Sequence, residues 1–211
     1  MPRSAAKTGA KTPRKPRAPK THQLADPVPE NTVFRDMMKK EWRSGPPVGS
    51  GGFGLIYLAD VETGRKVGQD ANYVLKVEPH DNGPLFCELN FYMRAAKPEM
   101  VQEWKSQHKL KQLGMPLYIA SGSHERDHTK YRFMIMERFS TDLQKLFEQN
   151  KKHFPPETVF SLGIQMLDVL QYIHEHDYAH GDIKASNMLL GFQKSVANQC
   201  YLVDYGLPSA T

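Results

Sequence analysis

The sequence is poor in cysteine and in long apolar runs. Cys87 and Cys200 are the two cysteines in 211 residues, and their spacing suits neither a disulfide framework nor a metal site. A reducing compartment is therefore favoured, and both thiols are expected to be small buried groups. No apolar run approaches the ~18 residues that indicate a membrane span, and no secretory signal is visible. A cytosolic or nuclear protein is the default expectation.

Acidic residues are missing from residues 1–22, which carry a charge of +7. The whole chain carries +5, so the remaining residues sum to −2. Because residues 1–22 have no periodic apolar face, we expect a disordered basic tail. Its charge is compatible with a merely solvated segment, and equally with nuclear import or nucleic-acid contact through residues 12–17.

The most informative stretch is residues 180–187, HGDIKASN, which leads into the apolar residues 188–190. Its spacing places Asp182, Lys184 and Asn187 on one tight loop. Many polar loops between a helix and a strand only turn the chain. These three groups, however, suit phosphoryl transfer, in which a carboxylate orients the attacking hydroxyl, a cation neutralises charge and an amide oxygen holds a metal ion.

A glycine-rich run, GSGGFG at residues 49–54, precedes the apolar and β-prone residues 55–59. In a dinucleotide-binding fold a helix would follow the glycines. A strand follows here, which favours a hairpin laid over phosphate groups. Glycine suits this role because a Cβ would hinder the approach of backbone N–H groups to anionic oxygens.

A predicted strand over residues 73–77 carries Lys76 between apolar neighbours. An ordinary solvated lysine is the alternative, but a buried ammonium needs a partner. Glu88 can supply one, because residues 84–97 form a plausible helix whose inward face lies beside Glu88. The other interpretation of Glu88 is a surface carboxylate on a solvated helix edge.

A short strand at residues 201–203 is expected to deliver Asp204, whose carboxylate suits a magnesium ion. The cluster of His174, His176 and His180 suggests zinc as an alternative. These histidines span a helix end and a loop without a common face, so we interpret His180 as a packed anchor of its loop.

The hydrophobic pattern predicts a five-stranded antiparallel sheet with one or two helices, followed by helices. We expect a helical turn near residues 34–40, strands at 117–122 and 131–136, and a helix at 99–113. A short helix should open at Thr141. A long helix over residues 156–176 carries two apolar stripes and should have neighbours on both sides.

These motifs, in this order, resemble the protein-kinase signature set. More specifically, NGPLF at 82–86, RAAKP at 94–98, YRFMIM at 131–136, YIHEH at 172–176, HGDIKASN and DYGL at 204–207 resemble the vaccinia-related kinase family of casein-kinase-like serine/threonine kinases. The resemblance implies an α+β, protein-kinase-like fold. Its β-rich N-lobe would span residues 42–136, after the tail and a linker at 23–41. A hinge at 137–140 and the first part of a helical C-lobe at 141–211 would follow.

The resemblance also implies ATP and Mg²⁺ as co-substrate and cofactor, and Ser/Thr acceptors on chromatin-associated proteins. It implies a nuclear address, with the cytoplasm as an alternative. The catalytic residues would be Asp182, Lys184 and Asn187, and the magnesium ligands Asn187 and Asp204. The implied nucleotide-binding residues are Gly49, Ser50, Gly51, Gly52, Phe53, Gly54, Ile56, Val74, Lys76, Glu88, Met136, Glu137 and Phe139.

The sequence stops at Thr211, where the family pattern would continue into an activation segment. We therefore expect a C-terminally truncated kinase, with the helix at 156–176 partly uncovered and the catalytic loop loosely held. Displacement of about 1 Å can lower a rate on the order of 100-fold. One alternative function is a catalytically weak or inactive form that binds nucleotide or partners without phosphoryl transfer. Another is a chromatin-tethering module acting through the tail.

Overall fold

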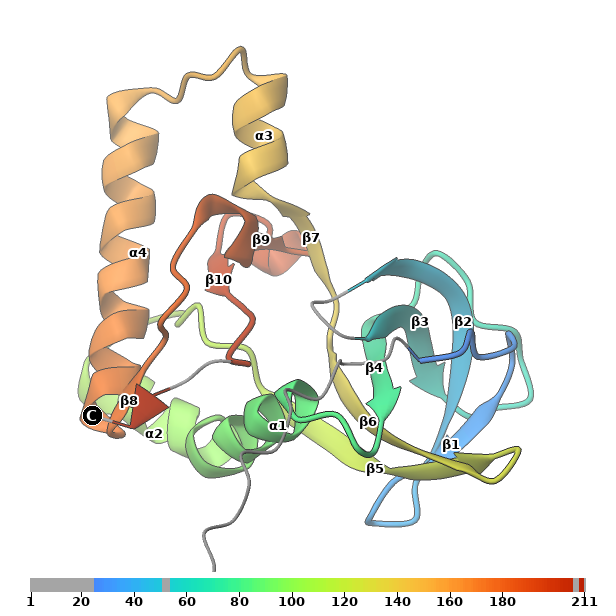
Figure 1. Ribbon diagram of the computed structural model, residues 1–211. Helices are drawn as coiled ribbons and strands as arrows, with labels where there is room; N and C mark the ends of the chain where they lie inside the picture. Colours follow the sequence, from blue (N-terminus) through green and yellow to red (C-terminus); the bar gives the residue numbers. More distant parts are fainter. Residues whose placement is uncertain (1–24, 51–53, 207–208, 211) are drawn as a thin grey trace, which may run out of the picture.

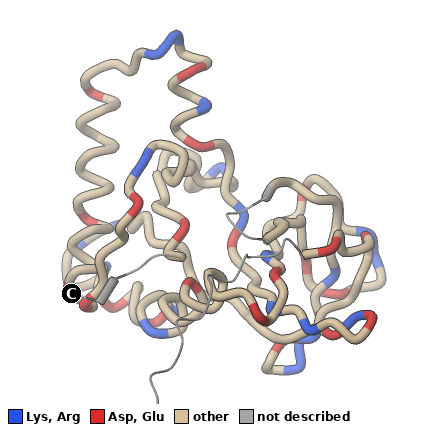
Figure 2. The backbone as a smooth tube through the Cα atoms, viewed as in Figure 1, with Lys and Arg blue, Asp and Glu red and all other residues tan. Residues whose placement is uncertain are grey.

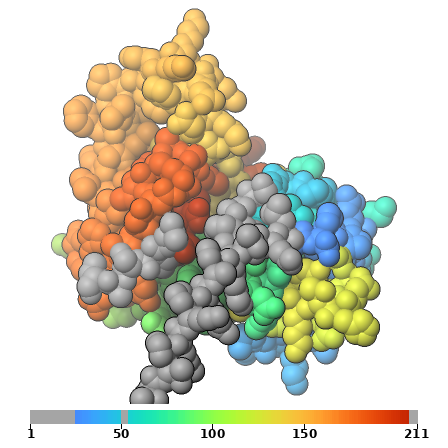
Figure 3. Space-filling model, in the orientation of Figure 1, coloured from blue at the N-terminus to red at the C-terminus, as the bar shows by residue number. Residues whose placement is uncertain are grey.

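The computed structural model describes residues 25–50, 54–206 and 209–210, so the predicted basic tail lies outside the described residues. A sheet-rich half and a helix-rich half are joined where β6 runs into β7 (Figure 1). In the space-filling view the blue, cyan and yellow segments of the sheet lie on one side of the molecule, and the orange and red segments lie on the other (Figure 3). No helix of the described part is long and apolar enough to cross a membrane.

The sheet has six antiparallel strands in the order β1-β2-β3-β4-β6-β5, one more than predicted. Its strands are β1 Val33–Arg35, β2 Glu41–Ser50, β3 Leu55–Val61, β4 Tyr73–Pro79, β5 Tyr118–Arg126 and β6 Thr129–Glu137. The loop predicted between β5 and β6 is shorter than expected, because pairing continues to Arg126 and Thr129. Asp127 and His128 make the turn with positive φ angles of 50° and 61°.

The helical turn expected near residues 34–40 was wrong: the segment forms β1 and a tight turn. The Asp36 carboxylate accepts hydrogen bonds from the backbone N–H groups of Met38 and Lys40 and from the Trp42 indole. Phe34, fully buried, packs edge-on against Phe133. Cross-strand pairing and this burial override the weak local preference for helix, as tertiary context often does.

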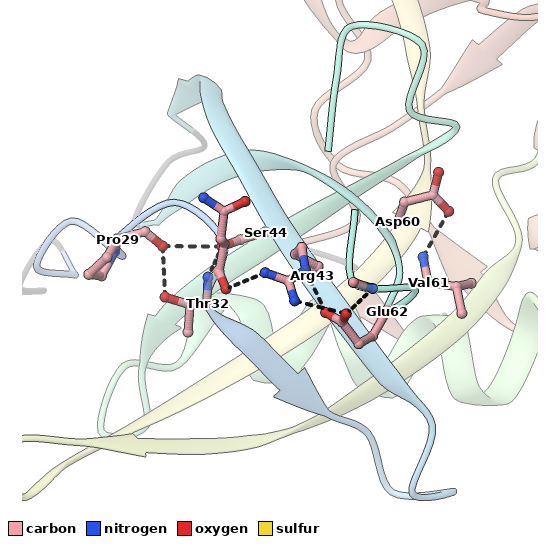
Figure 4. Close-up of polar contacts among 9 residues, drawn as sticks. Pro29, Thr32, Arg43, Ser44, Asp60, Val61 and Glu62 are labelled. Atoms are coloured by element: carbon pink, nitrogen blue, oxygen red, sulfur yellow. Dashed lines mark hydrogen bonds and ion pairs between the residues drawn. The ribbon is translucent and has the colours of Figure 1, made fainter. Parts of the chain in front are cut away.

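A network of polar contacts ties the segment before β1 to the sheet (Figure 4). The Pro29 carbonyl accepts hydrogen bonds from the Thr32 and Ser44 hydroxyls. Beside it, the Arg43 guanidinium contacts the Glu62 carboxylate at 2.6 Å and lowers the pKa of that carboxyl. The predicted linker is therefore packed on the sheet over its described residues, 25–41, where Ala25 and Val28 are buried.

The two faces of the sheet bury different clusters, as the two-residue period of a strand requires. On β6, Phe133 and Ile135 join the cluster beneath the N-terminal segment, whereas Met134 and Met136 join the cluster formed with the helices. That second cluster is continuous across both halves, and it holds in place the elements that carry the polar residues described below.

The helices are α1 Pro84–Ala95, α2 Pro98–Gln107, α3 Leu143–Gln149 and α4 Pro156–Glu175. Proline occupies the first turn of α1, α2 and α4, where its missing N–H is harmless. α2 ends six residues earlier than predicted, and α3 opens at Asp142 rather than Thr141, because the Asp142 carboxylate caps the Lys145 N–H.

The helical half contains the short strands β7 Phe139–Asp142, β8 Tyr178–Ala179, β9 Met188–Gly191, β10 Cys200–Leu202 and β11 Ser209–Ala210. One apolar stripe of α4, including Met166, Val169 and Ile173, is buried. The other, with Phe160, Ile164 and Leu167, is exposed among the described residues. Cys200 is buried as expected, but Cys87 is exposed, because α1 turns that position to solvent.

Candidate active site

The loop at residues 180–187 is anchored by His180, which is buried as predicted. One ring nitrogen, Nε2, lies 2.9 Å from the Val203 carbonyl oxygen, and the other, Nδ1, accepts a hydrogen bond from the Asp182 N–H at 3.2 Å. Burial lowers the pKa of His180, which favours the neutral ring that this arrangement requires. Between His180 and Asp182, Gly181 has a φ of 78°, in the left-handed region that glycine adopts at little cost.

Asp182, Lys184 and Asn187, predicted to act together, do converge in space. The Lys184 ammonium and the Asn187 amide nitrogen lie 2.6 Å and 3.1 Å from the Asp182 carboxylate oxygen Oδ2. The Asn187 amide also donates to the Asp182 carbonyl. The hydrogen bond from Lys184 lowers the pKa of Asp182, so the carboxylate is ionised at neutral pH. Both charged side chains remain accessible, which a group that meets a substrate requires.

Lys76 and Glu88 also meet, across two elements. Lys76 lies in β4, between Ile56 of β3 and Met134 of β6 in register, and Glu88 lies on the buried side of α1. The Lys76 ammonium is 2.6 Å from the Glu88 carboxylate. This excludes the solvated alternatives for both residues.

The described part of the glycine-rich run consists of Gly49 and Ser50, which end β2, and Gly54, which precedes β3. Gly51, Gly52 and Phe53 lie outside the described residues. A Cβ on Gly54 would collide with the Val77 carbonyl oxygen, whereas one on Gly49 would meet nothing within 4 Å. Of these two, Gly54 is the position where close packing of the run on β4 requires glycine.

Asp204 follows β10 and adopts a φ of 73°, an unusual backbone conformation for a residue other than glycine. Residues in such conformations cluster at functional sites. The end of β10 is fixed to the loop at residues 180–187, because the Val203 N–H donates to the Asn187 carbonyl at 2.9 Å. The pKa of Lys184 is raised by its hydrogen bond to Asp182 and further by the charges of Asp182 and Asp204, so Asp204 lies within electrostatic reach.

Tyr205 joins three elements of the site. Its ring is fully buried and stacks on Phe91 of α1 with centroids 4.0 Å apart, and it meets the His180 ring edge-on at 4.7 Å. Its hydroxyl contacts the Met115 sulfur at 3.4 Å, a weak partner. Phe91 was not predicted as a site residue, although an aromatic residue three positions after Glu88 could have indicated it.

No group of three His, Cys, Asp or Glu side chains in the described ranges could hold a metal ion, so the zinc alternative finds no support. Asn187 and Asp204 remain the predicted ligands of a magnesium ion. Each offers oxygen, the donor type that Mg²⁺ prefers, and magnesium commonly binds one or two protein side chains together with substrate phosphates.

The predicted hinge, residues 137–140, contributes to the lining of a separate cavity. Met136 is buried and pairs with Val74 of β4. Glu137 and Phe139 line a cavity of about 230 Å³ that is not lined by Lys76, Asp182 or Asp204. Burial raises the pKa of Glu137. The cavity that Glu137 and Phe139 line is therefore distinct from the polar groups around Lys76 and Asp182.

Comparison with known proteins gives consistent matches. A family described as the protein kinase domain matches residues 42–211. Nucleosomal histone kinase 1 of Drosophila melanogaster is 50% identical over 192 residues, covering 90% of this chain and 31% of that protein. Serine/threonine-protein kinase VRK2 of Homo sapiens is 50% identical over 192 residues, covering 91% of this chain and 37% of that protein.

B1 kinase of vaccinia virus (strain Western Reserve) is 40% identical over 180 residues, with 85% of this chain and 56% of that protein covered. The solved structure of vaccinia related kinase 3 is similar with a TM-score of 0.75 and 28% identity, over 88% of this chain and 54% of that one. The chain thus spans from about a third to just over half of the length of these relatives.

Proposed function

Because the chain belongs to the protein kinase family, and within it to the vaccinia-related kinases, we propose that it transfers the terminal phosphoryl group of ATP to serine or threonine residues of proteins. The observation that carries the proposal is that two sets of polar residues are connected by packed aromatic rings. The Lys76–Glu88 pair and the Asp182–Lys184–Asn187 loop are linked through the Phe91–Tyr205–His180 contacts.

The residues fit a magnesium–nucleotide complex. Close packing of Gly54 on β4 is compatible with a backbone that approaches phosphate oxygens. The Asn187 amide nitrogen is engaged by Asp182, which leaves the amide oxygen as the atom able to ligate a cation, together with the Asp204 carboxylate. A bound magnesium ion would neutralise charge on the phosphates.

Each side chain then has a task that suits its surroundings. Ionised Asp182 accepts a hydrogen bond from the acceptor hydroxyl and orients its oxygen for in-line attack. Lys184 donates to the phosphoryl group in transfer, for which it must leave or share its bond to Asp182. Lys76 holds the phosphates of the nucleotide, and Glu88 keeps its ammonium in place.

A kinase assay tests the proposal. The purified chain is incubated with radiolabelled ATP, Mg²⁺ and either casein or histone, beside Asp182→Asn and Asp127→Asn. Asp127 lies in the exposed β5–β6 turn and serves as a matched control. We expect the control to label acceptor protein like the wild type and Asp182→Asn to lose labelling. Equal labelling by Asp182→Asn would reject the mechanism. Thermal stabilisation by ATP without any turnover would favour the non-catalytic alternative.

For the acceptor, we propose proteins associated with chromatin and a nuclear location, since one relative is named a nucleosomal histone kinase. Residues 23–211 carry both signs of charge interspersed (Figure 2) and sum to −2, so nucleic-acid contact would fall to the basic residues 1–22. Deleting residues 1–22 should abolish salt-sensitive DNA binding without lowering casein phosphorylation. Unchanged DNA binding would contradict a role for the tail.

A further inference from the structure

A second carboxylate lies on the same strand face as Lys76. Glu78 follows Lys76 by two positions in β4, so their side chains leave the strand on the same side. Glu78 is only 1% exposed, and its cross-strand neighbour in register is Arg132 of β6. The Arg132 guanidinium lies 3.4 Å from the Glu78 carboxylate. The proposed phosphoryl transfer gives no role to Glu78 or Arg132.

The pair is attached to the start of α1. Arg132 donates to the carbonyl oxygens of Asn82 at 3.3 Å and His80 at 3.4 Å, which belong to the turn before the helix. Its guanidinium also lies over the Phe86 ring, 4.8 Å from the centroid. The side chain therefore holds three points of the segment that leads from β4 into α1.

Glu78 acts on the helix itself. The first N–H groups of a helix have no partner within the helix, and the residue at the N-cap of α1, Gly83, has no side chain to supply one. The N–H groups of Leu85 and Phe86 lie close enough to the Glu78 carboxylate to lower its pKa, in opposition to the effect of burial. A negative charge at this end is also favoured by the helix dipole.

α1 is thus held to β4 at two neighbouring points, its first turn at Glu78 and its second turn at Lys76 through Glu88. We infer that the Glu78–Arg132 pair is a positioning pair, which fixes the start of α1 so that Glu88 meets the Lys76 ammonium. This inference rests on the proposed function, because it gives the pair a task in nucleotide binding. Neither residue would touch the substrate.

The Glu78–Arg132 pair would restrict the position of the first turn of α1. Burial of Glu78 opposes its charge and raises its pKa, while Arg132 and the two N–H groups favour the ionised form. A pair of this kind is a weak source of net stability but specifies one arrangement, because removing one partner leaves a buried charge without compensation. Loss of Glu78 should therefore let the first turn of α1 shift, and a shift of about 1 Å can lower rates about 100-fold.

The test compares Glu78→Ala and Glu78→Gln with Glu62→Ala. Glu62 pairs with Arg43 in the same half of the molecule but contacts β2 and not α1, so it is the matched control (Figure 4). We expect Glu78→Ala to raise KM for ATP by about tenfold or more and to lower kcat. Glu78→Gln should restore part of this effect, since its amide oxygen can still accept from the helix N–H groups. Glu62→Ala should lower Tm and leave KM for ATP unchanged.

A second readout separates positioning from general destabilisation. In a Glu88→Gln background, Glu78→Ala should raise KM for ATP by less than it does in the wild type, because both changes act through the same contact. Additive effects of the two changes would overturn the inference. So would a Glu78→Ala protein with lowered Tm and unchanged KM.

If Glu78→Ala does not fold, Arg132→Lys replaces it, because lysine keeps the charge but loses the planar fork that reaches two carbonyls. Hydrogen exchange at the amides of residues 85–89, measured without nucleotide, should be faster in Arg132→Lys than in Glu62→Ala. This readout does not depend on phosphoryl transfer. Unchanged exchange would reject the positioning pair, whereas a wild type that neither binds nor uses ATP would reject the proposed function alone.

Discussion

Two lysine–carboxylate pairs of the candidate active site have the same separation and different surroundings. In both the ammonium nitrogen lies 2.6 Å from a carboxylate oxygen. The side chains of Lys76 and Glu88 are 18% and 6% exposed, whereas those of Lys184 and Asp182 are 51% and 36% exposed. The Lys76–Glu88 pair joins β4 to α1 and its members are 12 positions apart in the sequence. The members of the Lys184–Asp182 pair are two positions apart and lie on one loop.

This difference indicates different tasks. A buried pair that bridges two elements holds those elements in one arrangement, because separating its members leaves a desolvated charge. An exposed pair contributes little to stability and exchanges partners readily. The Lys76–Glu88 pair therefore suits a fixed part of the site, and the Asp182–Lys184 pair suits groups that turn to a substrate. The following experiments act on one pair at a time.

Breaking the exposed pair should have the largest effect on activity. Asp182→Asn removes the carboxylate that we propose orients the acceptor hydroxyl, and we expect kcat for casein phosphorylation to fall by about 10²–10⁴-fold. The free energy of unfolding should change by less than about 1 kcal/mol, because the pair is exposed. Steady-state kinetics and urea unfolding measure the two quantities. A large loss of stability would show that the pair is structural.

Breaking the buried pair should have the largest effect on stability. Glu88→Gln leaves the Lys76 ammonium without its counter-charge, and we expect a loss of about 2–3 kcal/mol in the free energy of unfolding, below the full cost for a completely buried pair. ATP binding should weaken as well. Glu148→Gln, a change at an exposed helical glutamate, is the control. A Glu88→Gln protein as stable as this control would refute the contrast between the pairs.

Tyr92, one turn after Glu88, tests the cost of a buried polar group that lacks a partner. It is fully buried, and its hydroxyl has no hydrogen-bond partner among the described residues. Tyr92→Phe should therefore raise the free energy of unfolding by about 1 kcal/mol, at the lower end of the cost of an unsatisfied buried group. Tyr172→Phe is the matched opposite, because the Tyr172 hydroxyl donates to the Ala95 carbonyl and its loss should destabilise. Changes of equal sign in thermal unfolding would contradict this.

The last effect concerns pH at the anchor of the exposed pair. Burial lowers the pKa of His180, so the unfolded chain, with a histidine pKa of about 6.5, takes up the proton first as pH falls. Stability from this group is present above pH 6.5 and is lost below it, by at most about 1.4 kcal/mol at pH 5.5. Urea unfolding gives the free energy of unfolding at pH 7.5 and at pH 5.5. The difference between these two values should be smaller for His180→Gln than for the control His174→Gln. Equal differences would exclude His180 as the source.

Much of the candidate site could be predicted because its signals are local. The spacing of Asp182, Lys184 and Asn187 places them on one loop whatever the rest of the chain does, and helical periodicity turned Glu88 toward the sheet. The strand at residues 33–35 could not be predicted, because its conformation depends on pairing with residues 41–43. The predicted burial of Cys87 was wrong for a related reason, since a cysteine's preference for burial yields to the direction in which α1 faces its neighbours.

The sequence by itself determined the chemistry on offer, namely which polar groups lie in which loop or strand and where glycine permits close packing. Only the tertiary structure decided that Lys76 meets Glu88, that Glu78 pairs with Arg132, and that Tyr205 stacks on Phe91 of α1 and meets His180 edge-on. The physical reason is the range of the forces involved. Helical periodicity and the spacing of residues on one loop depend on a few neighbouring residues, whereas the Lys76–Glu88 and Glu78–Arg132 contacts join residues 12 or more positions apart and depend on how the whole core packs.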